Sequence, residues 1–97
     1  MSVYMIIDIK INDSVMYEKY VQKVHPILIK YEGDYVVQTN NIVPLSGNWN
    51  PERIVIIKFP SKDKLRECFG SEEYKSIAEL RINSTESRTI LVIEQKN

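Results

Sequence analysis

Cysteine and histidine are nearly absent from this sequence, which has one of each, Cys68 and His25. A single cysteine cannot form a disulfide within the chain, and these two side chains alone cannot build a zinc site of the usual four-ligand type. The sequence therefore predicts a subunit with neither a disulfide nor a metal site of its own.

The sequence also lacks an excess of charge of either sign, because 13 basic residues balance 13 acidic ones. Nucleic-acid-binding domains carry a basic excess gathered on one face, so this balance argues against a nucleic-acid partner. Because the formal net charge is zero, charge repulsion offers little resistance to self-association.

Long apolar runs are missing as well. No stretch approaches the roughly 20 apolar residues that a membrane-spanning helix needs. The first residues, MSVYMIIDIKIN, have no positively charged start, and Asp8 interrupts their apolar run, so we expect no signal peptide and no membrane partner. These features predict a cytoplasmic protein, and its length predicts a single domain over residues 1–97.

Sequence motifs that bind common cofactors or carry a catalytic nucleophile do not occur. The sequence contains no phosphate-binding loop, no dinucleotide fingerprint and no nucleophile elbow. We therefore expect that the protein requires no organic cofactor, and its function must be sought in its fold and in individual polar residues.

The apolar residues that are present follow regular spacings. They alternate along residues 3–11, which predicts a strand. After a good N-cap at Asp13 they recur every three or four positions, which predicts a helix over 14–31, kinked or broken at Pro26 and stopped by Gly33. The same reasoning predicts strands over 34–43, 53–59 and 88–94, and helices over 62–69 and 72–84.

This order of elements, β-α-β-β-α-β, matches the ferredoxin-like arrangement, an α+β fold with a four-stranded antiparallel sheet. Right-handed crossovers place both helical segments on the same side of that sheet. The helices can therefore cover only one face, and the other should be polar if it faces water.

Apolar residues nevertheless occur on both faces of the two strands that should be central. The stretch IVII at residues 54–57 is continuous, and Tyr4 and Ile6 lie on the second face of the first strand. The chain has no spare element to cover that face, so we predict a homodimer formed through the sheet. Either Ile54 and Ile56 or Val55 and Ile57 face the partner, and the sequence leaves this choice open.

The sole tryptophan, Trp49, lies in the turn-rich stretch PLSGNWNP at residues 44–51. A large ring on a loop can pack on a core edge, pack on a partner subunit, or form the wall of a ligand pocket. We predict that the turn carries Trp49 to a surface that one subunit cannot complete by itself.

Arg81 places a cation on the apolar stripe of the predicted helix 72–84, which it shares with Tyr74. Burying an unpaired guanidinium is costly. The arginine can pack its stem and keep its head in water, pair with a carboxylate such as that of Asp8, or bind an anionic ligand in a bidentate manner.

Tyrosine is frequent, with six residues in the chain. Four of them fall on inward-facing positions of the predicted helices, where their rings fill the core or line a cavity suited to a small aromatic or carbonyl compound: Tyr17, Tyr20, Tyr31 and Tyr74. The single histidine, His25, is a candidate general base, because its unperturbed pKa lies near neutrality. Its place beside the apolar stripe also fits a solvated surface residue. Cys68 fits a small buried hydrophobe.

Four segments resemble, in order and in spacing, a small bacterial family catalogued as domain of unknown function 1330, within the dimeric α/β-barrel superfamily. They are D...Y..Y from Asp13, PILIKYEGDY from Pro26, L.G.W.P.R.V...FPS from Leu45 and S.EY..I..LR from Ser71. The family usually has Gly-Gly where this chain has Glu32-Gly33, a basic residue at Asp34, and Trp-Tyr at Phe69-Gly70.

The resemblance implies a ferredoxin-like subunit whose sheet packs on the sheet of its partner, and it implies no established reaction. Relatives in the wider superfamily are similar to cofactor-independent monooxygenases, haem-degrading enzymes, lactone isomerases and binding proteins, and a shared fold does not choose among these functions.

Together these observations predict a homodimer that binds or transforms a small organic molecule in a pocket between helices and sheet, without a metal or an organic cofactor. If it is an enzyme, with a monooxygenase- or isomerase-like activity, the candidate catalytic residues are Arg81, Tyr74 and His25. The candidate ligand-binding residues are Tyr17, Tyr20, Tyr31, Trp49, Tyr74 and Arg81. The alternative is a non-catalytic structural or binding module with a filled interior.

Overall fold

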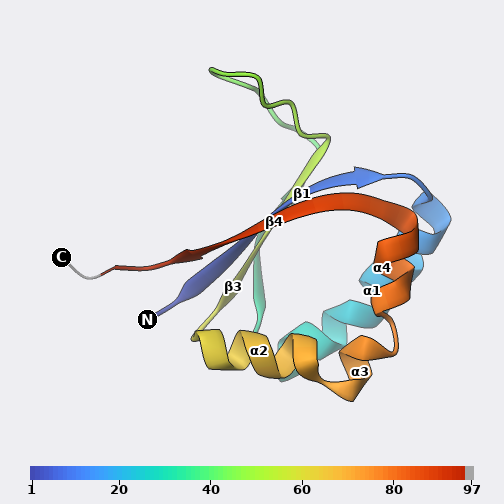
Figure 1. Cartoon of the computed structure of the whole chain (residues 1–97), viewed down its shortest axis with the longest axis vertical. Helices are drawn as coiled ribbons and strands as arrows, with labels where there is room; N and C mark the ends of the chain where they lie inside the picture. Colours follow the sequence, from blue (N-terminus) through green and yellow to red (C-terminus); the bar gives the residue numbers. More distant parts are fainter. Residues whose placement is uncertain (96–97) are drawn as a thin grey trace.

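The computed structural model describes residues 1–95 and shows helices packed on one antiparallel sheet (Figure 1). Its elements are β1 (Val3–Ile11), α1 (Ser14–Lys30), β2 (Asp34–Thr39), β3 (Arg53–Phe59), α2 (Lys62–Gly70), α3 (Glu72–Lys75), α4 (Ala78–Ser84) and β4 (Thr85–Ile93). The strands lie side by side as β2-β3-β1-β4. The predicted ferredoxin-like α+β fold is confirmed. No helix among the described residues combines the length and the apolar character needed to cross a membrane.

Most boundaries agree with the spacing of the apolar residues. Both central strands, β1 and β3, have the predicted bounds. α1 runs unbroken through Pro26, where we expected a kink or a break. Pro26 and Gln22 are exposed, so the carbonyl of Gln22 that proline leaves without a helical partner can bond to water instead. β2 ends at Thr39, before the two asparagines, and β4 begins at Thr85, earlier than predicted.

The prediction of one helix over residues 72–84 was wrong, because α3 and α4 are separate helices. The hydroxyl of Ser76 donates to the carbonyl of Glu73 at 2.7 Å. Such a local bond competes with the helical ladder. Ile77, at φ −116°, then bonds to Tyr74 three residues back rather than four, at 3.0 Å. Tyr74 and Arg81 consequently belong to different helices.

The residue that ends α1 in a left-handed conformation is Glu32, whereas Gly33 was expected to end the helix. Glu32 has φ 66°, in the left-handed region, and its N–H bonds to Ile29 while that of Gly33 bonds to Leu28, at 3.0 and 2.7 Å. This pair of bonds is a Schellman motif. Gly33 is needed for space instead, since a Cβ atom there would lie 2.9 Å from the Phe59 ring.

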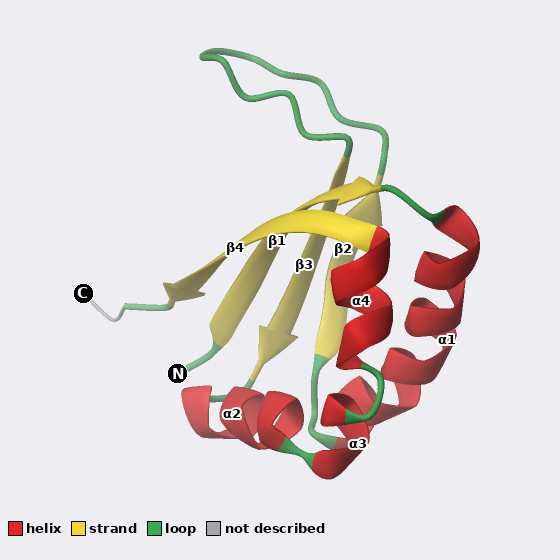
Figure 2. Cartoon of the chain, turned by 45° about the vertical axis from the view of Figure 1, so that its right-hand side comes forward, coloured by secondary structure: helices red, strands yellow, loops and turns green. Residues whose placement is uncertain are grey.

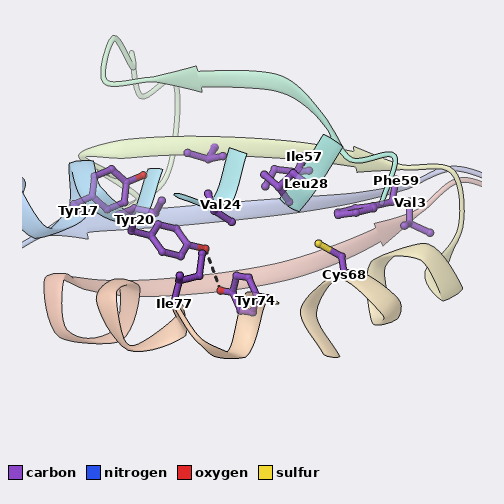
Figure 3. Packing of buried hydrophobic residues seen from close by; sticks show 12 residues of the cluster. Val3, Tyr17, Tyr20, Val24, Leu28, Ile57, Phe59, Cys68, Tyr74 and Ile77 are labelled. Atoms are coloured by element: carbon purple, nitrogen blue, oxygen red, sulfur yellow. Dashed lines mark hydrogen bonds between the residues drawn. The ribbon is translucent and has the colours of Figure 1, made fainter. Parts of the chain in front are cut away.

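The helices cover one face of the sheet, as Figure 2 shows. Alternate residues of the central strands point to this face under the helices, and several of them are buried, among which Phe59 has no exposed surface. Figure 3 shows the resulting core, whose buried residues are Val3, Ile9, Tyr17, Tyr20, Val24, Leu28, Val55, Ile57, Phe59, Cys68, Tyr74 and Ile77.

The opposite face, which we call the outer face, is not covered by any helix (Figure 2). The structure settles which pair of β3 residues lies there. Val55 and Ile57 are buried under the helices, so Ile54 and Ile56 face outward. In register with them are Asp8 and Ile6, and across β1 lies Ile90, which is 60% exposed. The outer face of one subunit is therefore apolar and open.

Candidate binding cavity

A cavity of about 330 Å³ lies between the helices and the covered face of the sheet. Its walls are mainly apolar and aromatic side chains, most of which come from the central strands and from α1, with one each from β2, α2 and α3: Met5, Ile7, Ile9, Tyr17, Tyr20, Val24, Leu28, Tyr35, Val55, Ile57, Phe69 and Tyr74. The remaining lining residues are polar: Gln38, Arg81, Thr85, Ser87 and Thr89. The volume falls in the range of pockets that hold small molecules, about 300 to 1,000 Å³.

Four of the lining residues form one hydrogen-bonded cluster, which we call the tyrosine–arginine cluster: Tyr20, Tyr74, Arg81 and Ser87. The hydroxyls of Tyr20 and Tyr74 lie 3.0 Å apart and point toward one another in Figure 3. Arg81 Nε donates to Tyr74 Oη at 3.3 Å, and its Nη1 donates to Ser87 Oγ at 3.1 Å. Four elements, α1, α3, α4 and β4, thus bring their polar groups together at one place.

Arg81 has no carboxylate partner among the described residues, and the candidate pairing with Asp8 was wrong. Asp8 is an even-numbered residue of β1, whose odd-numbered residues face the helices, so its side chain lies on the outer face. Arg81 is half-buried on the other side of the sheet. It is also the one lining residue of the cavity that carries a full charge.

Two tyrosines that line the cavity, Tyr20 and Tyr35, keep their protons at ordinary pH. Burial raises the pKa of Tyr20 well above its usual value, and the neighbouring Tyr74 raises it further. Burial also raises the pKa of Tyr35, to about 12. These hydroxyls are therefore neutral hydrogen-bond donors rather than bases.

Of the predicted site residues, Tyr17, Tyr20, Tyr74 and Arg81 line the cavity, whereas Tyr31, Trp49 and His25 do not. Tyr31 donates to Glu73 at 3.3 Å on the surface. His25 is exposed and stacks on the Tyr35 ring, with ring centres 5.8 Å apart. Cys68 is buried, as predicted, and burial raises its pKa to about 11, which makes it a poor nucleophile.

Sequence reasoning missed several lining residues on the strands. Gln38, Ser87 and Thr89 contribute polar atoms to the cavity, and Tyr35 contributes a ring. Ser87 and Thr89 share the face of β4 that pairs with Ile9 and Ile7. Their alternation was a usable signal, but only once the strand was known to begin at Thr85 rather than at residue 88.

Trp49 lies on the outer face. Its Nε1 donates to Asp8 Oδ2 at 2.8 Å, and Arg88 Nη2 donates to the same oxygen at 2.8 Å. The bond from Trp49, followed by that from Arg88, holds the pKa of Asp8 below its usual value. A hollow of about 310 Å³ lies beside this group, against Ile6 and Ile90. The turn therefore carries the tryptophan to the face that no helix covers.

Metal-ligating side chains do not gather anywhere in the part of the chain that the structure describes, where no three His, Cys, Asp or Glu residues come together. The tyrosine–arginine cluster brings hydroxyls and a guanidinium together in the cavity lining. Its hydroxyls and guanidinium can donate hydrogen bonds to a ligand oxygen inside the cavity.

Solved structures share this fold over nearly the whole chain. A protein of unknown function from Rhodopseudomonas palustris superimposes with a TM-score of 0.83 and 17% identity, covering 99% of this chain and 84% of that one. SnoaB, a cofactor-independent oxygenase from Streptomyces nogalater, superimposes with a TM-score of 0.70 and 11% identity, covering 99% of this chain and 95% of that one. A putative antibiotic biosynthesis monooxygenase from Caulobacter crescentus superimposes with a TM-score of 0.69 and 12% identity, covering 98% of this chain and 91% of that one. Likeness at such identities shows a common fold and not a common activity.

Sequence comparison gives the family. Among curated proteins no match was found. The pattern that defines the domain of unknown function 1330 (DUF1330) matches residues 2–95, nearly the whole chain. The resemblance carried by the four segments is thus confirmed, and this chain belongs to the DUF1330 family.

Proposed function

We propose that this protein binds, and can transform, a small organic molecule in the cavity between the helices and the sheet, and that it works as a homodimer. The observation that carries the proposal is the cavity itself, about 330 Å³ in volume with apolar walls and one polar cluster. Ligand pockets commonly have this composition, in which apolar walls supply affinity and a few polar groups fix orientation.

The chemistry that the cluster supports is the polarisation of a ligand oxygen. Tyr20 and Tyr74 offer hydroxyls, and Arg81 offers a positive charge. Donors arranged in advance around a ligand oxygen stabilise negative charge that develops on it during a reaction, such as enolate formation. This chemistry requires neither a metal nor an organic cofactor, in keeping with the fold's likeness to SnoaB, a cofactor-independent oxygenase.

The open outer face supports the homodimer. Its centre is lined by Ile6, Ile54 and Ile56, and Ile90 and Val92 on β4 are 60% and 42% exposed. A contiguous apolar patch of this kind marks an interaction site on a water-soluble protein. The face of a second copy offers the same apolar surface, and interfaces of standard size bury about 800 Å² on each partner.

The alternative is a non-catalytic module in which the tyrosine–arginine cluster only holds the fold together. This alternative draws on the hydrogen bonds that the cluster already makes within the chain. The two functions differ in whether the cavity accepts a ligand, because a structural module has no need of an accessible cavity.

A neutral probe, 2-naphthalenemethanol, tests the proposal by isothermal titration calorimetry. Thr89 lines the cavity from β4, so Thr89→Trp should fill it and weaken binding by about tenfold or more, a change of roughly 1.4 kcal/mol. The matched control is Ile82→Trp, which adds the same ring at an exposed position of α4 that does not line the cavity. Binding that is equal in the wild type and in Thr89→Trp would contradict the proposal, as would no binding to the wild type.

A further inference from the structure

We infer that the cavity selects an anion, and that its preferred ligand is a small aromatic carboxylate whose charged end lies against Arg81. This inference rests on the proposed binding function and names the class of ligand. It follows from the balance of charge around the cavity, from the geometry of the Arg81 guanidinium and from the energetics of a half-buried cation.

The lining of the cavity carries charge of one sign only. Arg81 is the single charged residue in the lining, and no acidic side chain is among the lining residues. The nearby carboxylates are engaged elsewhere: Asp8 lies on the outer face, and Glu73 binds Lys30 at 2.8 Å on the surface. A second cation, Arg53, lies over the Tyr17 ring at 6.0 Å, and Tyr17 lines the cavity. Positive charge at a low-dielectric site favours a negatively charged occupant.

The geometry of Arg81 suits a carboxylate. Its Nε and Nη1 donate to the hydroxyl oxygens of Tyr74 and Ser87. A hydroxyl that accepts from arginine keeps its own proton, and because the Tyr20–Tyr74 bond uses one of the two tyrosine protons, the other remains free to donate. The guanidinium also has five N–H groups in one plane, of which these two bonds use only two. The remaining N–H groups and the hydroxyl protons together offer donors to the two oxygens of a carboxylate.

The free protein leaves the charge of Arg81 incompletely compensated. Hydroxyl oxygens carry partial charges, so they solvate a half-buried guanidinium less well than an ion pair does. An anionic ligand supplies the missing countercharge, whereas a neutral ligand of the same shape gains only the apolar contacts. The aromatic walls, formed by side chains such as Tyr17, Phe69 and Tyr74, fit the ring of such a ligand.

The test compares 2-naphthoate with 2-naphthalenemethanol, which has the same ring system and no charge, by isothermal titration calorimetry near neutral pH. The wild type should bind 2-naphthoate about tenfold or more tightly than the alcohol. Arg81→Gln should remove this preference, because the carboxylate loses its countercharge whereas the alcohol loses at most a neutral hydrogen bond. Arg66→Gln is the matched control, since Arg66 is an exposed arginine of α2 that does not line the cavity.

Each outcome decides the inference. If the wild type binds the alcohol as tightly as the carboxylate, the anion preference is refuted and the binding function stands. If neither probe binds, both the inference and the proposed function fail. If Arg81→Gln does not fold, Arg81→Lys serves in its place: it keeps the charge and loses the planar fork, so it should retain part of the preference. A full preference in Arg81→Gln, or its loss in Arg66→Gln, would also overturn the assignment to Arg81.

Discussion

The hydroxyl pair of Tyr20 and Tyr74 shows how single atoms determine the character of the cavity. Both rings belong to the core, and their hydroxyls find each other at 3.0 Å in a setting that is otherwise largely apolar. A buried hydroxyl needs a partner, because an unsatisfied one costs about 1–3 kcal/mol. Each hydroxyl therefore has a hydrogen-bond partner within the core, and the pair also presents polar atoms to the cavity.

Removing one of these hydroxyls should be measurable in stability. Tyr20→Phe should lower the free energy of unfolding by about 1 kcal/mol, because Tyr74 loses its buried partner and keeps only the bond from Arg81. Tyr31→Phe is the control, and its exposed bond to Glu73 should be worth less than about 0.5 kcal/mol. Urea unfolding of both variants checks this, and an equal loss in the two would contradict the assigned role.

The raised tyrosine pKa values predict a loss of stability in alkali. The folded pKa of Tyr35 is about 12, and that of Tyr20 is also raised, so the folded protein holds these protons more tightly than the unfolded chain does. Their contribution is complete below the unfolded pKa of about 10 and is lost as pH rises toward the folded value. Unfolding free energies should fall through this window, with a smaller slope in Tyr35→Phe. A wild-type stability that stays level there would argue against the buried setting.

Residue positions also show where prediction from sequence stops. The inward stripe of Tyr17, Tyr20 and Tyr74 followed from helical spacing, and all three line the cavity. The partner of Arg81 did not follow, because a strand residue can point to either face and only the register places Asp8 away from the helices. Trp49 was predicted to reach a surface that one subunit cannot complete, and its bond to Asp8 places it on the outer face.

At the scale of elements, the turn between α1 and β2 makes opposite demands on two neighbouring residues. Glu32 adopts φ 66°, which costs an L-residue about 1–2 kcal/mol. Gly33 lies where a Cβ atom would collide with Phe59, a residue with no exposed surface. Glycine at position 32 would adopt the left-handed conformation without this cost, whereas at position 33 any larger residue would collide with Phe59.

Two substitutions in this turn should therefore change stability in opposite directions. Glu32→Gly should stabilise the protein by up to about 1 kcal/mol, reduced by the loss of the exposed Glu32–Lys64 pair at 3.2 Å. Gly33→Ala should destabilise it by about 1–3 kcal/mol, because the added carbon lies too close to the Phe59 ring. Thermal unfolding of both variants checks the pair, and shifts of the same sign would show that the turn is described wrongly.

Element order and type could be predicted from apolar spacing because each element packs one face against a common core. The break between α3 and α4 could not, since it depends on the Ser76 hydroxyl bonding to a backbone carbonyl within the segment. The left-handed residue was expected to be a glycine, yet Glu32 takes that conformation here because the adjacent Gly33 is required for space.

For the whole molecule, the uncovered outer face predicts self-association. Ile54→Glu combined with Ile56→Glu should give a monomer or aggregates, because charge on an interface core cannot be buried without a partner. Ile29→Glu is the matched control, since that isoleucine is 59% exposed on α1, away from the sheet. Sedimentation at micromolar concentration should show a dimer for the wild type and the control, and a monomeric wild type would refute the predicted interface.

The two faces of the sheet also allow a direct test of whether the cavity between the helices and the sheet is the binding site. Isoleucine methyl groups mark both faces, with Ile7, Ile9 and Ile57 at the cavity and Ile54 and Ile56 on the outer face. In methyl NMR spectra recorded while 2-naphthalenemethanol is added, the cavity methyl signals should shift progressively and the outer-face signals should stay in place. Shifts confined to Ile54 and Ile56, with Ile7 and Ile57 unchanged, would contradict the claim.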